Sequence, residues 1–305
     1  MPPSGRILFI FVDGIGLGAD DALANPFANP WAGFEALSSG RRWTSPGASA
    51  GVSEPDSLFR GIDACLGMNG LPQSGTGQAS LFTGVNCVEL AGRHYGPFPH
   101  SASRDVLREQ SLFARLADRG AAFANAYPPR FFNWVNRTKR WPTTTRACLD
   151  AGIRIRTIED LQAGRGIAAD VTGAGLANEL GLPVDVVGPE EAGDRLLALS
   201  SDHAFTMMEV FHTDKAGHAM NAESAHRILR PLDGLLAHLA SHRPGDLTIV
   251  LSSDHGNLED LSIKTHTRNE VPLAVLGPGA GLFESVVDLT GVAPAVEAVV
   301  RGPAA

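Results

Sequence analysis

Six carboxylate and imidazole side chains stand at the ends of short apolar runs or in the loops next to them. They are Asp13, Asp214, His218, Asp254, His255 and His266. The clearest run begins at Leu247, is rich in β-branched residues and stops abruptly at Asp254-His255-Gly256. Such a run is typical of a buried strand in a parallel sheet. Because ligands of open α/β sheets bind at the carboxyl ends of the strands, we expect the six side chains to gather there.

The mixture of carboxylates and imidazoles predicts bound metal. Asp214 and His218 are four positions apart, so a helix that starts there would place both on one face, within reach of one ion. Taken alone, this spacing is more often an N-cap aspartate followed by a surface histidine. Mixed oxygen and nitrogen ligands suit Zn²⁺ or Mn²⁺, and the six residues are too many for one tetrahedral ion. Two ions about 3.5–4 Å apart would use them all and would suit in-line displacement at phosphorus.

A hydroxyl group joins these candidates in the glycine-rich segment 70–84, where small residues lead into a short apolar helix pattern. Ser74 or Thr76 would lie at the N-terminus of that helix, where backbone N–H groups and the helix dipole favour negative charge. This position suits a nucleophile that becomes an alkoxide and then carries phosphate. The alternative is an N-cap residue in a glycine-rich turn, which is the more common explanation of the local pattern alone.

Asp13 follows the apolar run 7–12 and is followed by Gly14, Gly16 and Gly18. Glycines after a strand raise the possibility of a dinucleotide site, but the G-x-G-x-x-G spacing is not met and turn residues follow instead of a long helix. Asp13 itself is either a turn cap or a ligand. Its place at a strand end, beside glycines that allow close approach, favours the ligand.

Alternating strand and helix patterns predict an α/β core. Strand patterns cover 6–12, 121–126, 204–211, the run from 247, and 271–277. Helical patterns cover 105–119, 190–200 and 222–241, and 284–300 is expected to be a closing helical region. Residues 37–60, which are rich in Ser, Gly, Pro and Arg, are expected to form a surface loop.

Residues 128–189 differ in character from the flanking core, which we place at 1–127 and 190–305. Their first part mixes basic and aromatic side chains, namely Arg130, Arg137, Lys139, Arg140 and Arg146 with Phe131, Phe132, Trp134 and Trp141. Three interpretations apply: a single-stranded nucleic-acid surface, a packed insertion with solvated arginines, or a lid that offers arginine to an anionic substrate. The lid is slightly favoured over the packed insertion, and both over nucleic acid.

The composition excludes several other classes of protein. The formal charge of −8 over 305 residues argues against general nucleic-acid binding. Cys65, Cys87 and Cys148 are odd in number and form no C-x-x-C pair, which indicates free thiols in a reducing compartment. The early apolar run 7–12 is too short for a signal peptide or a membrane span. We therefore expect a cytoplasmic protein without a membrane or nucleic-acid partner, and the sequence leaves its oligomeric state open.

In combination, the motifs resemble the metalloenzyme branch of the alkaline phosphatase superfamily, which includes cofactor-independent phosphoglycerate mutase and phosphopentomutase. The resemblance rests on VDGIG with Asp13, Ser74 ahead of Gly77, DKAGH with Asp214 and His218, SDHGN with Asp254 and His255, and HTRNEVP with His266. It implies a doubly wound α/β core with a cap segment inserted after the nucleophile region. It also implies two divalent ions, Mn²⁺ or Zn²⁺.

The family pattern assigns each ion its ligands. One ion would be held by Asp214, His218 and His266, and the other by Asp13, Ser74, Asp254 and His255. Ser74 takes the nucleophile position, with Thr76 as the second choice. Two departures affect the substrate: Gln78 stands where the mutases carry histidine, and residues 128–189 are fewer than a mutase cap.

The resemblance implies transfer of a phosphoryl group from a small phosphomonoester through a phosphoserine. A short insertion excludes water poorly, which favours a phosphatase slightly over a phosphomutase of phosphosugars or phosphoglycerate. Arg130, Arg137 and Arg140 are the candidate substrate contacts. A protein that binds metal or a phosphorylated ligand without turnover is the other hypothesis.

Overall fold

The computed structural model describes residues 5–302, and its centre is a seven-stranded sheet with the order β2-β3-β9-β8-β1-β7-β4. The strands are β1 (Arg6–Val12), β2 (Val52–Glu54), β3 (Ser57–Ile62), β4 (Ala121–Phe123), β7 (Phe205–Val210), β8 (Leu247–Ser252) and β9 (Val271–Leu276). Strands β8, β1, β7 and β4 run parallel, whereas β9 pairs antiparallel with both β8 and β3. The parallel half therefore brings the carboxyl ends of β8, β1 and β7 side by side.

Strand β1 lies in the middle of the parallel half and is apolar on both faces. Ile7, Phe9 and Phe11 belong to one buried cluster, and Leu8 and Ile10 belong to the cluster on the opposite side. Because successive side chains of a strand point to opposite faces, a strand covered on both sides shows no polar alternation. This explains why the first apolar run of the sequence is continuous.

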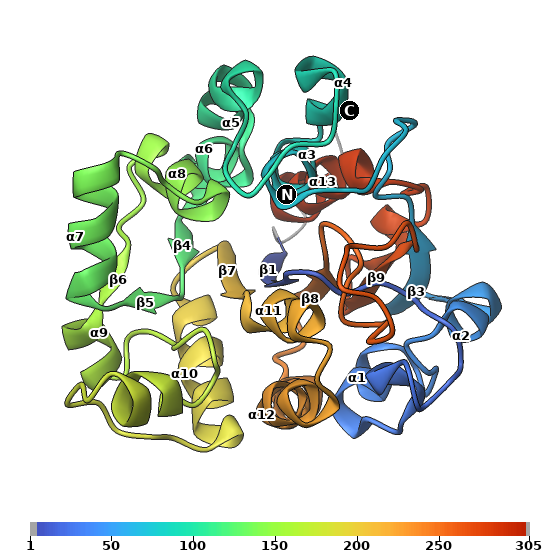
Figure 1. The fold of residues 1–305 in the computed structure, drawn as a ribbon. Coiled ribbons are helices and arrows are strands. Elements are labelled where there is room, and N and C mark those ends of the chain that lie inside the picture. The colour runs from blue at the N-terminus through green and yellow to red at the C-terminus, as the bar shows by residue number, and fades with distance from the viewer. Residues whose placement is uncertain (1–4, 303–305) are drawn as a thin grey trace.

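Helices cover both faces of the sheet (Figure 1). One layer contains α3 (Ser74–Thr83), α4 (Cys87–Ala91), α5 (Arg104–Gln110), α6 (Leu112–Leu116), α8 (Thr143–Asp150) and α13 (Val292–Arg301). The other contains α1 (Ala32–Leu37), α10 (Pro189–Ser201) and α12 (Ala222–His242). Short helices complete the chain at α2 (Ser45–Ala50) and α11 (His212–Ala219), with single 3-10 turns at Pro26–Ala28, Ser101–Ser103, Ala117–Arg119, Ala280–Phe283 and Leu289–Gly291. The predicted doubly wound α/β core is confirmed.

The segment 128–189 lies beside the β4 edge of the sheet (Figure 1). It contains α7 (Pro129–Thr138), α8, α9 (Ile158–Gln162), a π-helical turn (Gly175–Glu179) and strand β6 (Arg156–Thr157), which pairs parallel with β5 (Ala126–Tyr127). Ala147 and Cys148 of α8 belong to the main core. Ile158 and Leu161 of α9 belong to a separate small cluster. The segment therefore packs partly on the core and partly on itself, and its division from the core at 128 and 189 stays a prediction.

The expected surface loop at 37–60 is wrong, because this region supplies α2, β2 and most of β3. Leu58, Phe59 and Ile62 of β3 are buried, and the strand pairs on one side with the nearby β2 and on the other with β9, which is distant in sequence. Arg60 and Gly61 interrupt the apolar pattern of this strand. Its place in the central sheet therefore depends on β9, a partner that local sequence does not reveal.

The predicted helix 105–119 is also wrong as a single element, since it is divided at Ser111. Ser111 has an extended backbone and accepts a hydrogen bond from the backbone N–H of Ala114, which caps the start of α6. Serine competes with the helix backbone in this way. The predicted strand 121–126 is likewise divided between β4 and β5, and α13 begins only at Val292, late in the predicted helical region.

Helix α12, with 21 residues, packs an apolar face on the sheet through Leu229, Leu232 and Leu236. Its other faces carry charged and polar residues, and Pro231 lies within it. Neither this helix nor any other between residues 5 and 302 combines the length and apolar character needed to cross a bilayer.

Candidate metal centre

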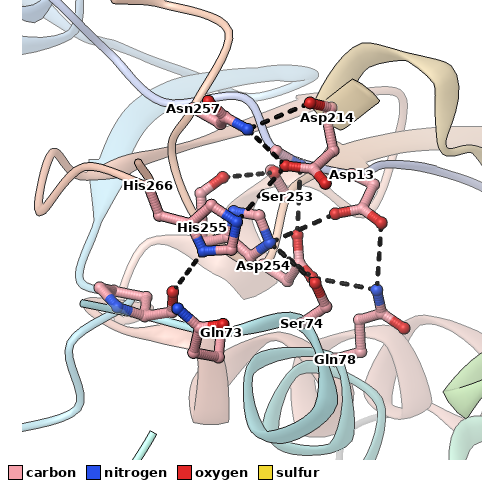
Figure 2. Close-up of polar contacts among 12 residues, drawn as sticks. Asp13, Gln73, Ser74, Gln78, Asp214, Ser253, Asp254, His255, Asn257 and His266 are labelled. Atoms are coloured by element: carbon pink, nitrogen blue, oxygen red, sulfur yellow. Dashed lines mark hydrogen bonds and ion pairs between the residues drawn. The ribbon is translucent and has the colours of Figure 1, made fainter. Parts of the chain in front are cut away.

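The site forms where three parallel strands end next to one another. Asp13 follows β1, Asp214 lies in the first turn of α11 after β7, and Asp254 lies just beyond β8. β1 pairs with both β7 and β8, so the order of the strands brings the three carboxylates together. The N-terminus of α3 approaches from one side with Ser74 as its first residue, as Figure 2 shows.

Gly14 allows this close approach. It has a φ of 70°, and a Cβ atom placed there would lie 2.7 Å from Oδ1 of Asp214 and 2.9 Å from its Cα. Both the left-handed backbone and the lack of space require glycine. Glycine at position 14 therefore allows the end of β1 to lie in direct contact with the start of α11.

One group of donors surrounds Nε2 of His255. This atom lies 3.0 Å from Oγ of Ser74, 3.4 Å from Oδ1 of Asp13 and 3.6 Å from Oδ2 of Asp254. Asp13, Asp254 and His255 are all buried and close enough together to hold one metal ion. Ser74 adds a hydroxyl to the same group.

A second group lies next to the first. Nε2 of His266 lies 3.2 Å from Nε2 of His218 and 3.6 Å from Oδ1 of Asp214, and Nε2 of His218 lies 3.4 Å from Oδ2 of Asp214. The rings of His255 and His266 stack with their centroids 3.8 Å apart, which joins the two groups. Asp214, His255 and His266 also meet the geometric requirement for one ion.

The histidine hydrogen bonds show that a cation fits here. Nδ1 of His266 contacts the carbonyl oxygen of Pro72 at 2.7 Å, and Nδ1 of His218 contacts that of Lys264 at 2.8 Å. Because a carbonyl can only accept, each Nδ1 carries the proton and each neutral ring directs an Nε2 lone pair inward. Oδ1 of Asp13 is buried, and no residue between 5 and 302 donates a hydrogen bond to it. Two lone pairs and several carboxylate oxygens that converge in this way favour a cation between them.

Burial opposes the charged forms of these groups when no cation is bound. It raises the pKa of Asp13 well above the ordinary value, and the charges of Asp254 and Asp214 add to this effect. Burial also raises the pKa of Asp254 to about 7 and lowers the pKa of His255 and of His266. A divalent cation favours carboxylates and neutral imidazoles, so protons and metal compete for this site.

Gln78 is a polar residue next to the site, and the sequence analysis assigned it no role. It lies one turn after Ser74 on α3 and directs its Nε2 toward Oδ2 of Asp254 at 3.0 Å and Oδ2 of Asp13 at 3.4 Å (Figure 2). The sequence could have indicated this contact, because Gln78 lies four residues after Ser74 and therefore on the same face of the helix. Gln78 thus positions two of the candidate carboxylate ligands.

Glu259 is another buried residue that sequence reasoning missed. Its carboxylate accepts hydrogen bonds from the backbone N–H of Gly16 at 2.9 Å, the backbone N–H of Asn257 at 2.7 Å and the side chain of Asn269 at 3.0 Å. Thr267 donates to it as well. Glu259 thereby joins the loop after β1 to the loops after β8 and before β9, which carry His255 and His266.

Asn257 holds Asp214 in place through its Nδ2 atom, which lies 2.6 Å from Oδ1 of that aspartate. The backbone carbonyl of Asp214 accepts from the same nitrogen at 3.1 Å. Its position directly after the Asp-His-Gly motif was the only sequence signal for this residue.

Ser74 and Thr76 point in different directions. Ser74 faces the metal-binding groups, whereas Oγ1 of Thr76 accepts a hydrogen bond from the backbone N–H of Tyr95 at 3.1 Å. Ser74 is therefore the hydroxyl of this pair that contacts the candidate ligands.

The three arginines predicted to contact substrate lie on the surface of the segment 128–189. Arg130 and Arg137 are exposed on α7. Arg140 is exposed as well, and its guanidinium lies 5.8 Å from the ring centroid of Phe98. None of the three lines the cavity of about 510 Å³ in front of Ser74, whose lining includes Asp214, His218 and His266. The role of these arginines stays a prediction.

Comparison with known families provides the classification. A model of the metalloenzyme superfamily matches residues 190–294. That segment contains five of the candidate ligands, namely Asp214, His218, Asp254, His255 and His266. This part of the chain is similar to the metalloenzyme superfamily. The name agrees with the histidine geometry, which fits a cation.

Two named relatives of this superfamily are mutases. The 2,3-bisphosphoglycerate-independent phosphoglycerate mutase 1 of Methanothermobacter thermautotrophicus is 27% identical over 179 residues, which are 58% of this chain and 41% of the relative. The phosphopentomutase of Anaeromyxobacter dehalogenans is 31% identical over 221 residues, which are 68% of this chain and 53% of the relative. The chain thus matches about half the length of these metalloenzymes or less.

Solved alkaline phosphatases share the fold of this chain. The enzyme from the Antarctic bacterium TAB5 aligns with a TM-score of 0.54 and 11% identity over 99% of this chain and 100% of its own. The Thermus thermophilus enzyme aligns with a TM-score of 0.52 and 13% identity over 99% of this chain and 92% of its own. At this identity the similarity establishes the alkaline-phosphatase-like fold.

Proposed function

We propose that this metalloenzyme transfers the phosphoryl group of a small phosphomonoester to Ser74 and then to water. The observation that carries the proposal is the position of Oγ of Ser74, at the N-terminus of α3 and 3.0 Å from Nε2 of His255. This hydroxyl stands in front of a buried set of carboxylates and imidazoles that fit divalent cations. A nucleophile, a helix N-terminus and a cation site in one place are the components that phosphoryl transfer requires.

Each residue has a role in this proposal. Asp13, Ser74, Asp254 and His255 would hold one ion and Asp214, His218 and His266 the other, with Mn²⁺ and Zn²⁺ as the candidates. When bound, the ions supply Lewis acidity that lowers the pKa of the Ser74 hydroxyl and neutralises phosphoryl charge. The N-terminus of α3 stabilises the negative charge of the alkoxide and of the phosphoserine. Gln78 and Asn257 keep the carboxylates oriented.

Phosphomutase activity is the second candidate, and the named relatives favour it. Phosphoglycerate mutase and phosphopentomutase are names of proteins that this chain resembles over part of their length. A mutase must protect its phosphoenzyme from water while the substrate reorients. We favour hydrolysis because the segment 128–189 is short and packs partly on the core through α8.

The test begins with a generic aryl phosphate, assayed with Mn²⁺ and with Zn²⁺. A rapid acid quench should trap phosphate on Ser74, and Ser74→Ala should remove the adduct while metal binding largely survives. Label on Thr76 would show that the nucleophile is wrong. Phosphorus NMR with phosphosugars and phosphoglycerates then separates the two activities, since a phosphatase releases inorganic phosphate and a mutase moves phosphate within one substrate. Metal binding without any turnover would favour the non-catalytic alternative.

A further inference from the structure

A second hollow adjoins the one in front of Ser74. Its volume is about 610 Å³, and it shares Leu71, Gln73 and Gly96 with the first hollow. Volumes of this size are those of small-molecule sites. A molecule whose phosphate meets Ser74 would therefore extend along Gln73 into the second hollow.

Residues 93–96 form the outer wall of the second hollow, and this wall is hydrogen-bonded to α3, the helix that carries Ser74. The backbone N–H of Thr76 donates to the carbonyl of Tyr95 at 2.9 Å, and the backbone N–H of Tyr95 donates to Oγ1 of Thr76 at 3.1 Å. A Cβ atom at Gly75 would lie 2.0 Å from the carbonyl oxygen of Phe98, so the wall lies directly against the start of α3. The distance between this wall and the nucleophile is thus set by direct hydrogen bonds.

Apart from the candidate metal ligands, the charged side chains that line the two hollows are positive. Arg93 lines the second hollow, and Lys264 lines the first. No aspartate or glutamate lines the second hollow among residues 5–302. Just outside it, Arg268 donates to the carbonyl of Gly70 at 2.9 Å. An anionic group would meet attraction here and little repulsion.

Arg93 is the cation best placed to contact such a group. It is exposed, and its guanidinium lies 5.5 Å from the ring centroid of Tyr95, which holds it beside the wall. Arg93 forms no ion pair with a carboxylate in the part of the chain that the structure describes. Its guanidinium donors therefore remain available for a ligand, and guanidinium binds carboxylate or phosphate in a bidentate manner.

We propose that the second hollow binds a second anionic group of the substrate, a carboxylate or a phosphate, through Arg93. This inference rests on the proposed function, since it concerns the far end of the same phosphomonoester. Selectivity for the substrate would then depend on residues 93–96, next to Ser74, and not on the arginines of the segment 128–189. The substrate class is then a phosphomonoester with a second negative charge.

The test measures binding to the metal-loaded protein by calorimetry, with two phosphonates that cannot be hydrolysed. Methylphosphonate carries one anionic group, and 3-phosphonopropionate carries a carboxylate as well. We expect the wild type to bind the phosphonopropionate about tenfold more tightly, as one charge-assisted contact would allow. Arg93→Gln should abolish this preference and leave methylphosphonate binding unchanged. Arg137→Gln is the matched control and should retain the preference, because Arg137 is exposed on α7 and lines neither hollow.

Three outcomes would overturn the inference: no preference in the wild type, a preference that survives Arg93→Gln, or a preference that Arg130→Gln abolishes instead. Absence of binding by both phosphonates would also contradict it. Turnover of a generic aryl phosphate separates this result from the proposed function. Turnover without a preference rejects the anion site alone, and a preference lost in Arg93→Gln without turnover rejects the catalytic proposal alone.

Discussion

At the scale of single residues, the histidine rings determine what the centre can hold. His218 and His266 each use Nδ1 on a backbone carbonyl, which leaves two Nε2 atoms 3.2 Å apart. Two lone pairs at this distance repel each other unless a cation or a proton lies between them. Burial lowers the pKa of His266, which disfavours the proton and leaves metal as the stabilising partner.

Asp254→Asn tests the charge of the centre. The asparagine keeps the shape but removes a buried negative charge that we assign to a metal ligand. We expect the wild type to retain about two transition-metal ions per chain after desalting, and the variant to retain fewer and to lose at least about 100-fold in rate. Elemental analysis and the aryl phosphate assay measure both. Asp20→Asn, at an exposed position, is the control, and full activity after exhaustive chelation would contradict the metal assignment.

Gln78→Leu tests the amide that contacts Asp13 and Asp254. The variant leaves two buried carboxylates without this donor, so we expect it to cost about 1–3 kcal/mol in the free energy of unfolding of the metal-loaded protein. Urea titration measures the loss. Gln78→His places a donor of another shape there and should recover part of the stability. Equal stability of Gln78→Leu and the wild type would show that the amide does not support the carboxylates.

At the scale of elements, the start of α3 has two neighbours. Ser74 faces the ends of β1 and β8, and two residues later Thr76 faces the loop that forms the wall of the second hollow. Because residues two apart on a helix point in different directions, one short segment serves both contacts. The same helix therefore sets where the nucleophile lies and where the wall begins.

Thr76→Val tests the contact between α3 and this loop. Valine has nearly the same shape but leaves the backbone N–H of Tyr95 without its acceptor, which should cost about 1–3 kcal/mol in the free energy of unfolding. Thr76→Ser keeps the hydroxyl and should stay within about 1 kcal/mol of the wild type. Denaturant unfolding of the two variants gives the comparison. A loss in Thr76→Ser with none in Thr76→Val would indicate that the methyl group, and not the hydrogen bond, matters.

At the scale of the whole molecule, Glu209 couples pH to stability. It lies buried on β7, its Oε2 atom accepts from Oη of Tyr127 at 3.3 Å, and burial raises its pKa to about 7. A carboxyl whose pKa is raised by folding stabilises the fold fully below its unfolded pKa, near 4.5. This contribution is lost as the pH rises through about 7.

Glu209→Gln should remove this pH dependence, because the amide does not ionise. In the metal-free protein, we expect the variant to gain about 3 kcal/mol relative to the wild type between pH 4.5 and pH 8. Denaturant unfolding at a series of pH values measures the difference. Curves for the two proteins that stay parallel over this range would show that Glu209 keeps an ordinary pKa.

The sequence by itself determined the parts of this protein that depend on local pattern. The bounds of β1 follow from its continuous apolar run, and the small residues around Ser74 and Thr76 indicate the start of α3. The six candidate ligands could be named because polar residues at the ends of adjacent parallel strands must meet. Similar reasoning placed Asp214 and His218 on one helix, α11.

Only the tertiary structure decided features that depend on contacts between distant segments. The pairing of β3 with β9, the different contacts of Ser74 and Thr76, and the link from Glu259 to Gly16 involve partners far away in sequence. The second hollow beside Gln73 is of the same kind, since residues 69–73 and 93–96 meet only in the folded chain. Helix and strand periodicity reports which face of an element is buried, whereas the neighbour on that face is chosen by the packing of the whole chain.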